Sequence, residues 1–395
     1  MFGAEQENAR LQRLRVGWLI DGRGGPHLRD MVIDIKDGII IDVKPFDGNQ
    51  KALYSLTHAT VLPALMDAHV HLVFSGTTDA QRRKAQLNDT VDHLESVIID
   101  HLRRHLNYGV VAVRDGGDRD GVVLQCKKTY RFGPDLPYVA ATCWAWHAKG
   151  RYGGMLGKTP PEDMSLAAAV KDQLHDVDHV KVIQSGLNSI DRYGYQGPPQ
   201  FSREALSQMV VIAHAAQRPV MVHANGEAAV QMALDAGCDS IEHGYFMGLD
   251  NLKRMADRGT CWVPTVVPMA MLAKASSLSA AQREVAQRTV DHQLEQILQA
   301  HALGVGIALG TDAGSFGVDH GVAVATELRL FIQAGLSIEE AIACASANVA
   351  PLMGFSDRGA LVPGMKADFI IVPGAADQVL DNLNHIESVV YQEEK

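Results

Sequence analysis

The chain has 395 residues, of which 47% are hydrophobic and 21% are charged. These proportions are ordinary for a soluble globular protein, and they exclude a disordered or fibrous chain. Lys and Arg total 36 and Asp and Glu total 46, so the formal net charge is −10. This balance argues against nucleic acid or an anionic membrane as a partner and favours a small-molecule substrate.

Cysteine usage and the N-terminal segment bear on the compartment. The 5 cysteines lie far apart and form no CxxC pair, so the sequence indicates neither a disulfide framework nor a thiolate zinc site. Residues 1–22 lack an apolar stretch with a small-residue cleavage site, and no run of eighteen apolar residues occurs in the chain. We therefore expect a cytoplasmic protein, and we expect it to form a homo-oligomer.

Both ends of the chain have the pattern of β-hairpins. RVGWLIDG (15–22) and DMVIDIKDGIIIDVKP (30–45) cluster β-forming residues around Asp-Gly turns, and GALVPGMKADFIIVPG (359–374) and HIESVVYQEE (385–394) have the same character. The pattern predicts that the two termini, residues 1–59 and 357–395, pair into one β-rich domain. Residues 60–356 would then form a central insert.

Within the insert, apolar runs that close on polar or Gly residues alternate with helical stretches that show i, i+3, i+4 apolar spacing. The runs are ATVLPALMDAHVHL (59–72), GVVAVRDGG (109–117), LPYVAATCWAWH (136–147), DHVKVIQSG (178–186), RPVMVHANG (218–226), DSIEHGYF (239–246), TCWVPTVV (260–267) and VGIALGTDAG (305–314). Eight strand-helix units predict an α/β fold, a (β/α)8 TIM barrel with its active site at the C-terminal ends of the strands. A doubly wound open sheet is the alternative, but no GxGxxG follows the first strand.

The polar residues that close these runs would meet at one end of the barrel. His69 and His71 flank Val70, so they project on the same side of an extended strand and could hold one ion together. The later strands contribute Lys181, His223, His243 and Asp312. Each alone has a structural explanation, a satisfied core histidine or a turn-capping carboxylate, but together they predict a nitrogen and oxygen site for zinc or a similar divalent ion.

Lys181 lies inside VKVI, a strand expected to be buried on both faces. Burial and nearby metal cations would disfavour its ammonium form, and a neutral amine can react with CO2 to give a carbamate. That anion could bridge two metal ions. The alternative is an ordinary cation whose head reaches out of the barrel mouth.

These motifs give the chain a family resemblance. VLPALMDAHVHL, HVKVIQSG, PVMVHANG, SIEHG, GTDAG and GMKADFIIV, in this order, resemble those of the amidohydrolase superfamily, and most of all its prolidase-like group, which includes Xaa-Pro and Xaa-Arg dipeptidases and relatives of imidazolonepropionase. The resemblance implies a barrel with a β-sandwich made from both termini and a binuclear metal site. One metal would be held by His69, His71 and Asp312, the other by His223 and His243, with carboxylated Lys181 between them.

The chain departs from the family pattern in three places. Ala64 replaces the usual Gly before the HxH strand, and Asn225 stands where relatives carry a second His. The loop WHAKGRYGGMLG (146–157) replaces a GGHG-like signature. The second and third departures put the substrate in question.

The implied mechanism uses a hydroxide, because two metal ions that share a water lower its pKa to about 7. Asp312 would take the proton of the hydroxide and pass it to the departing amine. The second metal and His147 would hold the oxyanion, although His147 could instead simply pack beside Trp144 and Trp146.

Residues 185–202, SGLNSIDRYGYQGPPQFS, are too long and too rich in Gly, Pro and Ser for a tight turn, so we expect them to reach over the site. Candidates for binding a substrate carboxylate and lining the rim are Arg192, Tyr193, Tyr195, Arg151 and His320. Each could equally be a solvated loop residue.

The sequence thus predicts a metal-dependent hydrolase that cleaves an amide or peptide bond in a dipeptide or N-acyl amino acid. A mononuclear zinc deaminase is one alternative, because Glu227 follows His223 closely. In the first turn of a helix, however, a Glu also has a structural explanation. The same site could serve a lactone, urea or carbamate hydrolase. A metal-free scaffold is disfavoured, because every ligand position is filled.

Overall fold

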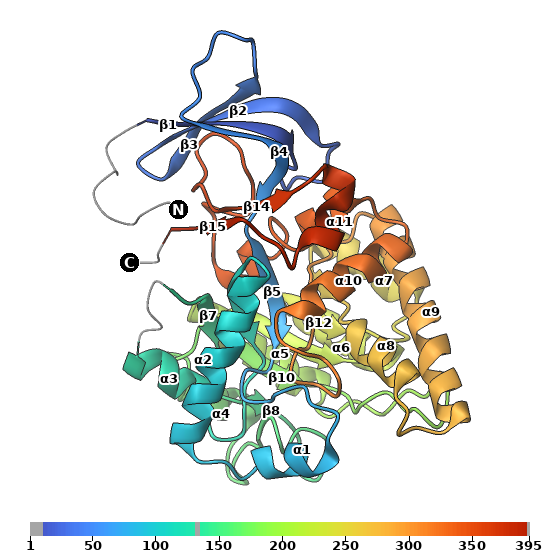
Figure 1. Cartoon of the computed structure of the whole chain (residues 1–395). Helices are drawn as coiled ribbons and strands as arrows, with labels where there is room; N and C mark the ends of the chain where they lie inside the picture. Colours follow the sequence, from blue (N-terminus) through green and yellow to red (C-terminus); the bar gives the residue numbers. More distant parts are fainter. Residues whose placement is uncertain (1–10, 131–134, 393–395) are drawn as a thin grey trace.

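The structure is a computed structural model that describes residues 11–130 and 135–392 (Figure 1). The first ten residues, on which the expectation about targeting partly rests, and the last three residues of the predicted C-terminal part lie outside the described residues. Among the described helices, none has the length and apolar character needed to cross a membrane.

Segments from both ends of the chain form one six-stranded sheet, which lies in the upper part of Figure 1. Its order is β15-β14-β4-β1-β2-β3. The strands are β1 (Gln12–Leu19), β2 (Leu28–Lys36), β3 (Ile39–Pro45), β4 (Tyr54–Pro63), β14 (Phe369–Pro373) and β15 (Ser388–Val390). Asp37 and Gly38, both at positive φ, make the predicted turn between β2 and β3. The union of the two termini is confirmed, whereas the limits 1–59, 60–356 and 357–395 remain predictions.

The central part is the predicted barrel of parallel strands. These are β5 (Leu65–Val70), β6 (Val110–Asp115), β7 (Tyr138–Ala141), β8 (Ala145–Trp146), β9 (Gly157–Lys158), β10 (Val180–Ile183), β11 (Val220–Ala224), β12 (Ser240–His243) and β13 (Cys261–Val263). They pair in the orders β5-β6-β7 and β13-β12-β11-β10-β8-β9. Every residue of β5, β6, β10, β11 and β12 is buried, as expected of parallel strands covered on both faces.

The eighth predicted strand, residues 305–314, closes the barrel without forming a regular strand. Isolated parallel bridges join Trp262 to Ile307 on one side and Val70 to Ala313 on the other. The segment therefore lies between β13 and β5, and it carries Asp312 to the end of the barrel where His69 and His71 lie.

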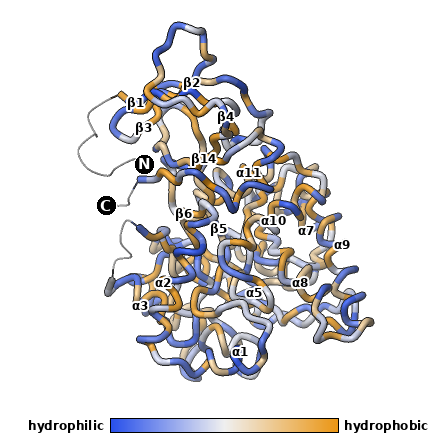
Figure 2. The backbone as a smooth tube through the Cα atoms, in the orientation of Figure 1, coloured by the Kyte–Doolittle hydropathy of each residue, from blue (hydrophilic) through white to orange (hydrophobic). Residues whose placement is uncertain are grey.

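Helices pack around the barrel (Figure 1). They are α1 (Ala80–Gln86), α2 (Val91–Asn107), α3 (Val122–Tyr130), α4 (Leu166–Lys171), α5 (Arg203–Ala215), α6 (Glu227–Ala236), α7 (Leu249–Arg258), α8 (Val267–Lys274), α9 (Ala280–Ala302), α10 (Val322–Gln333), α11 (Ile338–Cys344) and α12 (Val379–Asn382), with 3₁₀ turns η1 (Ala350–Met353) and η2 (Ala376–Gln378). Figure 2 shows hydrophobic and hydrophilic residues alternating along the outer helices, as amphipathic packing requires.

The packing of α10 can be tested at Phe331, which is fully buried. We expect Phe331→Ala to lower the free energy of unfolding by about 3–5 kcal/mol, because it removes a large side chain from a close-packed interior. Val322→Ala is the matched control on the same helix, since Val322 is 40% exposed. Its effect should stay within about 0.5 kcal/mol. Equal shifts of the two variants in urea unfolding would contradict this placement of α10.

Candidate active site

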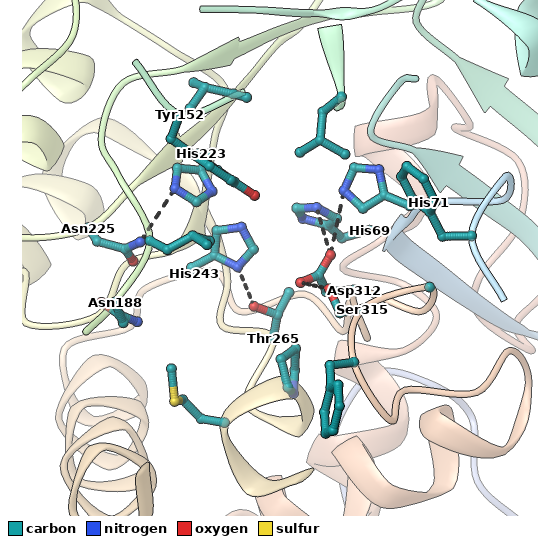
Figure 3. Close-up of a pocket in the computed structure, with 18 of the residues that line it drawn as sticks. His69, His71, Tyr152, Asn188, His223, Asn225, His243, Thr265, Asp312 and Ser315 are labelled. Atoms are coloured by element: carbon teal, nitrogen blue, oxygen red, sulfur yellow. Dashed lines mark hydrogen bonds and ion pairs between the residues drawn. The ribbon is translucent and has the colours of Figure 1, made fainter. Parts of the chain in front are cut away.

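His69, His71 and Asp312 form a compact group of potential metal ligands. His69 belongs to β5 and His71 follows it directly, and both side chains are buried. The Asp312 Oδ1 atom lies 3.7 Å from His69 Nε2 and 3.5 Å from His71 Nε2. One ligand atom from each residue lies within 4.8 Å of the others, which is close enough for a single ion to contact all three (Figure 3).

Neighbouring strands bring three further predicted residues to the same place. Lys181 lies on β10, His223 on β11 and His243 ends β12. The ring centroids of His223 and His243 are 4.5 Å apart, and those of His243 and His69 are 4.9 Å apart. The buried Lys181 Nζ and His69 Nε2 atoms have no hydrogen-bond partner among the described residues. Unpartnered buried nitrogens are costly, so this arrangement suits bound cations.

For three of the four rings, hydrogen bonds at Nδ1 fix which nitrogen faces the group, whereas His223 places Nε2 3.2 Å from the Gly186 carbonyl oxygen. His69 Nδ1 lies 2.7 Å from Glu242 Oε2, and His243 Nδ1 lies 2.6 Å from Thr265 Oγ1. His71 Nδ1 lies 3.2 Å from the Gly117 carbonyl oxygen. These contacts leave Nε2 of all three rings free for a metal, the arrangement seen in metal-ligating histidines.

Glu242 is itself held by a buried cation, a feature that the sequence reasoning missed. Arg114 Nη2 donates to Glu242 Oε1 over 2.9 Å, and Ser240 Oγ donates to the same oxygen over 2.6 Å. Both Arg114 and Glu242 are fully buried. The chain Arg114–Glu242–His69 therefore orients the imidazole. Its signal lay in SIEHG and VRDGG, where a charged residue interrupts an apolar strand.

Burial sets the protonation of the group. Desolvation lowers the pKa of Lys181 to about 8 and the pKa of His71 and of His223 to about 3. Desolvation also raises the pKa of Asp312 to about 7. The imidazoles are therefore neutral near pH 7 and present lone pairs, which is the form that binds metal ions.

A cavity of about 310 Å³ opens onto these residues. Apolar side chains from several loops and helices form much of its wall, among them Phe74, Leu156, Leu187, Met269 and Leu272. Leu187 and Asn188 belong to the segment 185–202, so this segment does reach the site. A mostly apolar cavity with few polar groups is typical of a small-molecule site.

The loop residues predicted to bind a substrate carboxylate lie outside this cavity. Arg151 donates to the Pro198 carbonyl oxygen over 3.0 Å, and the Arg192 guanidinium lies 4.7 Å from the centroid of the Tyr195 ring. Tyr193 packs against Phe246 with ring centroids 5.3 Å apart. These four predicted residues bind the loops to one another and do not line the cavity.

Two predicted histidines also lie away from the cavity. His320 is buried, stacks on His101 with centroids 3.9 Å apart, and places Nε2 2.8 Å from the Phe74 carbonyl oxygen. His147 is buried, with Nδ1 3.1 Å from the Ala148 carbonyl oxygen. Neither lines the cavity.

Several residues that the sequence reasoning did not select as site residues line the cavity, among them Tyr152, Asn188 and Arg83. Figure 3 shows the Tyr152 hydroxyl projecting between His223 and the pair His69 and His71. Asn225, one of the departures from the family pattern, accepts from the Tyr245 N–H over 3.1 Å and donates to the Gly186 carbonyl oxygen over 3.3 Å. It therefore fixes two loops at the cavity.

A parallel barrel with a His-His-Asp metal site at the C-terminal ends of its strands defines a metal-dependent hydrolase. The sequence profile of the Amidohydrolase family matches residues 60–393. The chain belongs to this family, whose members hydrolyse carbon–nitrogen bonds. The predicted resemblance is thereby confirmed.

Individual relatives agree with this assignment. The chain is 27% identical over 412 residues to an ochratoxinase from Aspergillus niger, with 93% of this chain and 82% of that protein covered. It is 24% identical over 371 residues to an imidazolonepropionase from Deinococcus deserti, with 87% and 85% covered. The crystal structure of a Xaa-Pro dipeptidase with bound methionine in the active site is similar over 97% of this chain and 98% of that chain, with a TM-score of 0.80 and 25% identity.

The role of Glu242 can be tested with two readouts. Glu242→Gln should weaken metal binding 10- to 100-fold, because His69 loses the carboxylate that orients it. It should also destabilise the protein by about 3–5 kcal/mol, because Arg114 is left buried and unpaired.

The double variant Arg114→Met, Glu242→Gln separates the two effects. It should recover part of the stability while metal affinity, measured by chelator competition, stays low. Full recovery of metal affinity in the double variant would show that Glu242 acts on stability alone.

Proposed function

We propose that the protein is a binuclear metal-dependent amidohydrolase that cleaves an amide or peptide bond in a dipeptide or an N-acyl amino acid. The observation that carries this proposal is the Lys181 Nζ atom, which is buried and unpartnered among the described residues, on a side chain that lines the same cavity as the imidazoles. A single ion held by His69, His71 and Asp312 would not use Lys181. Two ions, with zinc the best match to these ligands, would use it.

In this proposal Lys181 is carboxylated. Its lowered pKa of about 8 makes the neutral amine far more abundant near pH 7 than it is for an ordinary lysine. The Nζ lone pair forms a bond to the carbon of CO2 and Nζ loses a proton to water, which leaves a carbamate anion. His69, His71 and Asp312 would hold one metal, and His223 and His243 the other, with the carbamate shared. The carbamate replaces an unpaired buried amine with an anion beside two cations.

Bound divalent ions would supply an activated water and polarise the substrate carbonyl. The residues of the chain then transfer protons and stabilise the charge that develops in the reaction. Asp312 accepts the proton of the attacking water and transfers it to the departing amine. The Ser315 hydroxyl donates to Asp312 Oδ2 over 2.8 Å, which orients the carboxylate and leaves Oδ1 toward the histidines.

Tyr152 is the better candidate for the oxyanion donor that we first assigned to His147. Its hydroxyl projects into the cavity, whereas His147 does not line it (Figure 3). Burial raises the pKa of Tyr152, so the phenol stays protonated and can donate a hydrogen bond. Such a donor stabilises the negative charge that develops on the carbonyl oxygen.

The deaminase alternative needs a Glu at the site. Glu227 is exposed at the start of α6, and its main-chain N–H donates to Gln196 Oε1 over 2.9 Å. It does not line the cavity, so the arrangement favours hydrolysis of an amide over deamination. Lactones, ureas and carbamates remain the substrates to compare. A Xaa-Pro dipeptidase with methionine in its active site is among the similar structures, which supports amino acid derivatives.

Metal stoichiometry tests the proposal directly. The purified protein should hold two metal equivalents per chain, and ¹³C NMR after equilibration with ¹³CO2 should show a carbamate signal. Lys181→Met should lose that signal, one metal equivalent and the hydrolysis of dipeptides and N-acyl amino acids. Lys171→Met, at the end of α4, should keep all three. One equivalent in the native protein, with ammonia released from amino-heterocycles, would favour the deaminase.

The oxyanion assignment predicts that Tyr152→Phe lowers kcat about 100-fold or more with little change in KM, because the lost hydrogen bond forms in the transition state. Metal content should not change. Tyr195→Phe is the control, since Tyr195 does not line the cavity. A kcat that falls for His147→Ala and not for Tyr152→Phe would restore the earlier assignment.

A further inference from the structure

Arg83 places a guanidinium in the wall of the active-site cavity without an acidic partner. It lies in the last turn of α1 and lines the cavity. Its Nη1 atom reaches two carbonyl oxygens at long distance, 3.3 Å to Thr77 and 3.4 Å to Gly314. The ion pairs found among the described residues include none for Arg83, and its guanidinium carbon lies 5.9 Å from the centroid of the Phe316 ring.

This cation is partly desolvated. Burial lowers the pKa of Arg83, yet a guanidinium stays charged at neutral pH. Asp312 is the acid that acts on it, but the Asp312 carboxylate already contacts Ser315, His69 and His71. A desolvated charge without a partner is costly, so the cavity favours a ligand that brings an anion to Arg83.

The position of Arg83 indicates which half of the substrate carries that anion. Arg83 bonds to the carbonyl oxygen of Gly314, two residues after Asp312, and Asp312 delivers the proton to the departing nitrogen. Arg83 therefore lies on the side of the leaving amine. Tyr152 and Asn188 come from other loops of the cavity wall, which the acyl half would face.

Resting on the proposed amide hydrolysis, we propose that Arg83 binds the carboxylate of the leaving amino acid. The substrate is then an N-acylated amino acid with a free carboxylate. Its side chain lies against the apolar surface formed by Met269, Leu272 and Phe316, which favours a large apolar side chain. A guanidinium suits this role, because it can donate two parallel hydrogen bonds to a carboxylate.

The test compares two substrates that differ only in the carboxylate, N-acetyl-L-phenylalanine and N-acetylphenethylamine. Arg83→Gln should raise KM for the first roughly 30-fold or more with kcat within a few-fold, and leave both constants for the second unchanged. For N-acetyl-L-phenylalanine, the KM of Arg83→Lys should lie between those of the native protein and Arg83→Gln, because Lys keeps the positive charge but cannot donate two parallel hydrogen bonds. Arg82→Gln is the matched control, since Arg82 is exposed and does not line this cavity.

A binding measurement separates this inference from the proposed function. Calorimetry should show that L-phenylalanine binds the native protein and that Arg83→Gln weakens this binding. The same substitution should leave the affinity for phenethylamine unchanged. If neither amide is hydrolysed but this dependence on Arg83 is seen, the inference holds and the proposed function fails. If Arg83→Gln changes both substrates equally, or leaves phenylalanine binding unchanged, the inference is overturned.

Discussion

The closing of the barrel through main-chain hydrogen bonds is the constraint on which the site depends. Ala68 N donates to the Leu309 carbonyl oxygen over 2.9 Å, and Asp312 N donates to the His69 carbonyl oxygen over 2.7 Å. His69 and Asp312, far apart in sequence, therefore share a peptide hydrogen bond. Their side chains meet because the backbone positions them, and the loops around the rim can vary without moving them.

The electrostatics of the interior follow from this closure. Around the site the barrel buries Arg114 in an ion pair with Glu242, whereas the buried Lys181 Nζ atom feels Asp312 and Asp115 only at a distance and has no hydrogen-bond partner among the described residues. Glu242 is committed to Arg114 and His69, so it cannot also compensate Lys181. The imidazoles are therefore neutral and present lone pairs, whereas Lys181, with a pKa lowered to about 8, keeps much of its charge near pH 7. A cation bound by the imidazoles would lower the pKa of Lys181 further, so the two are electrostatically linked.

The barrel and the meeting of His69, His71 and Asp312 at its rim were predictable because buried parallel strands are continuous apolar runs, and a polar residue that ends such a run faces the rim. The residues of the cavity wall could not be predicted from the sequence. Arg83 lies on α1, which has no buried residue, so no periodicity marked it. His147 and Tyr152 share one loop, and only the fold of that loop decides which of them faces the cavity. His320 is buried in the interior, where it stacks on His101. This contact joins segments that are far apart in the sequence, so no local pattern predicts it.

The backbone at the site is strained, and the surrounding structure holds it. Asp312, His243 and Thr265 have φ values of 55°, 67° and 46°. Such conformations cost about 1–3 kcal/mol each for residues with side chains. The His243 carbonyl oxygen accepts from Gln293 Nε2 over 2.6 Å and from Trp262 Nε1 over 3.0 Å. Because Gln293 belongs to α9 and Trp262 to β13, His243 cannot relax without disrupting the barrel wall. The ligand positions are therefore set before any metal or substrate binds.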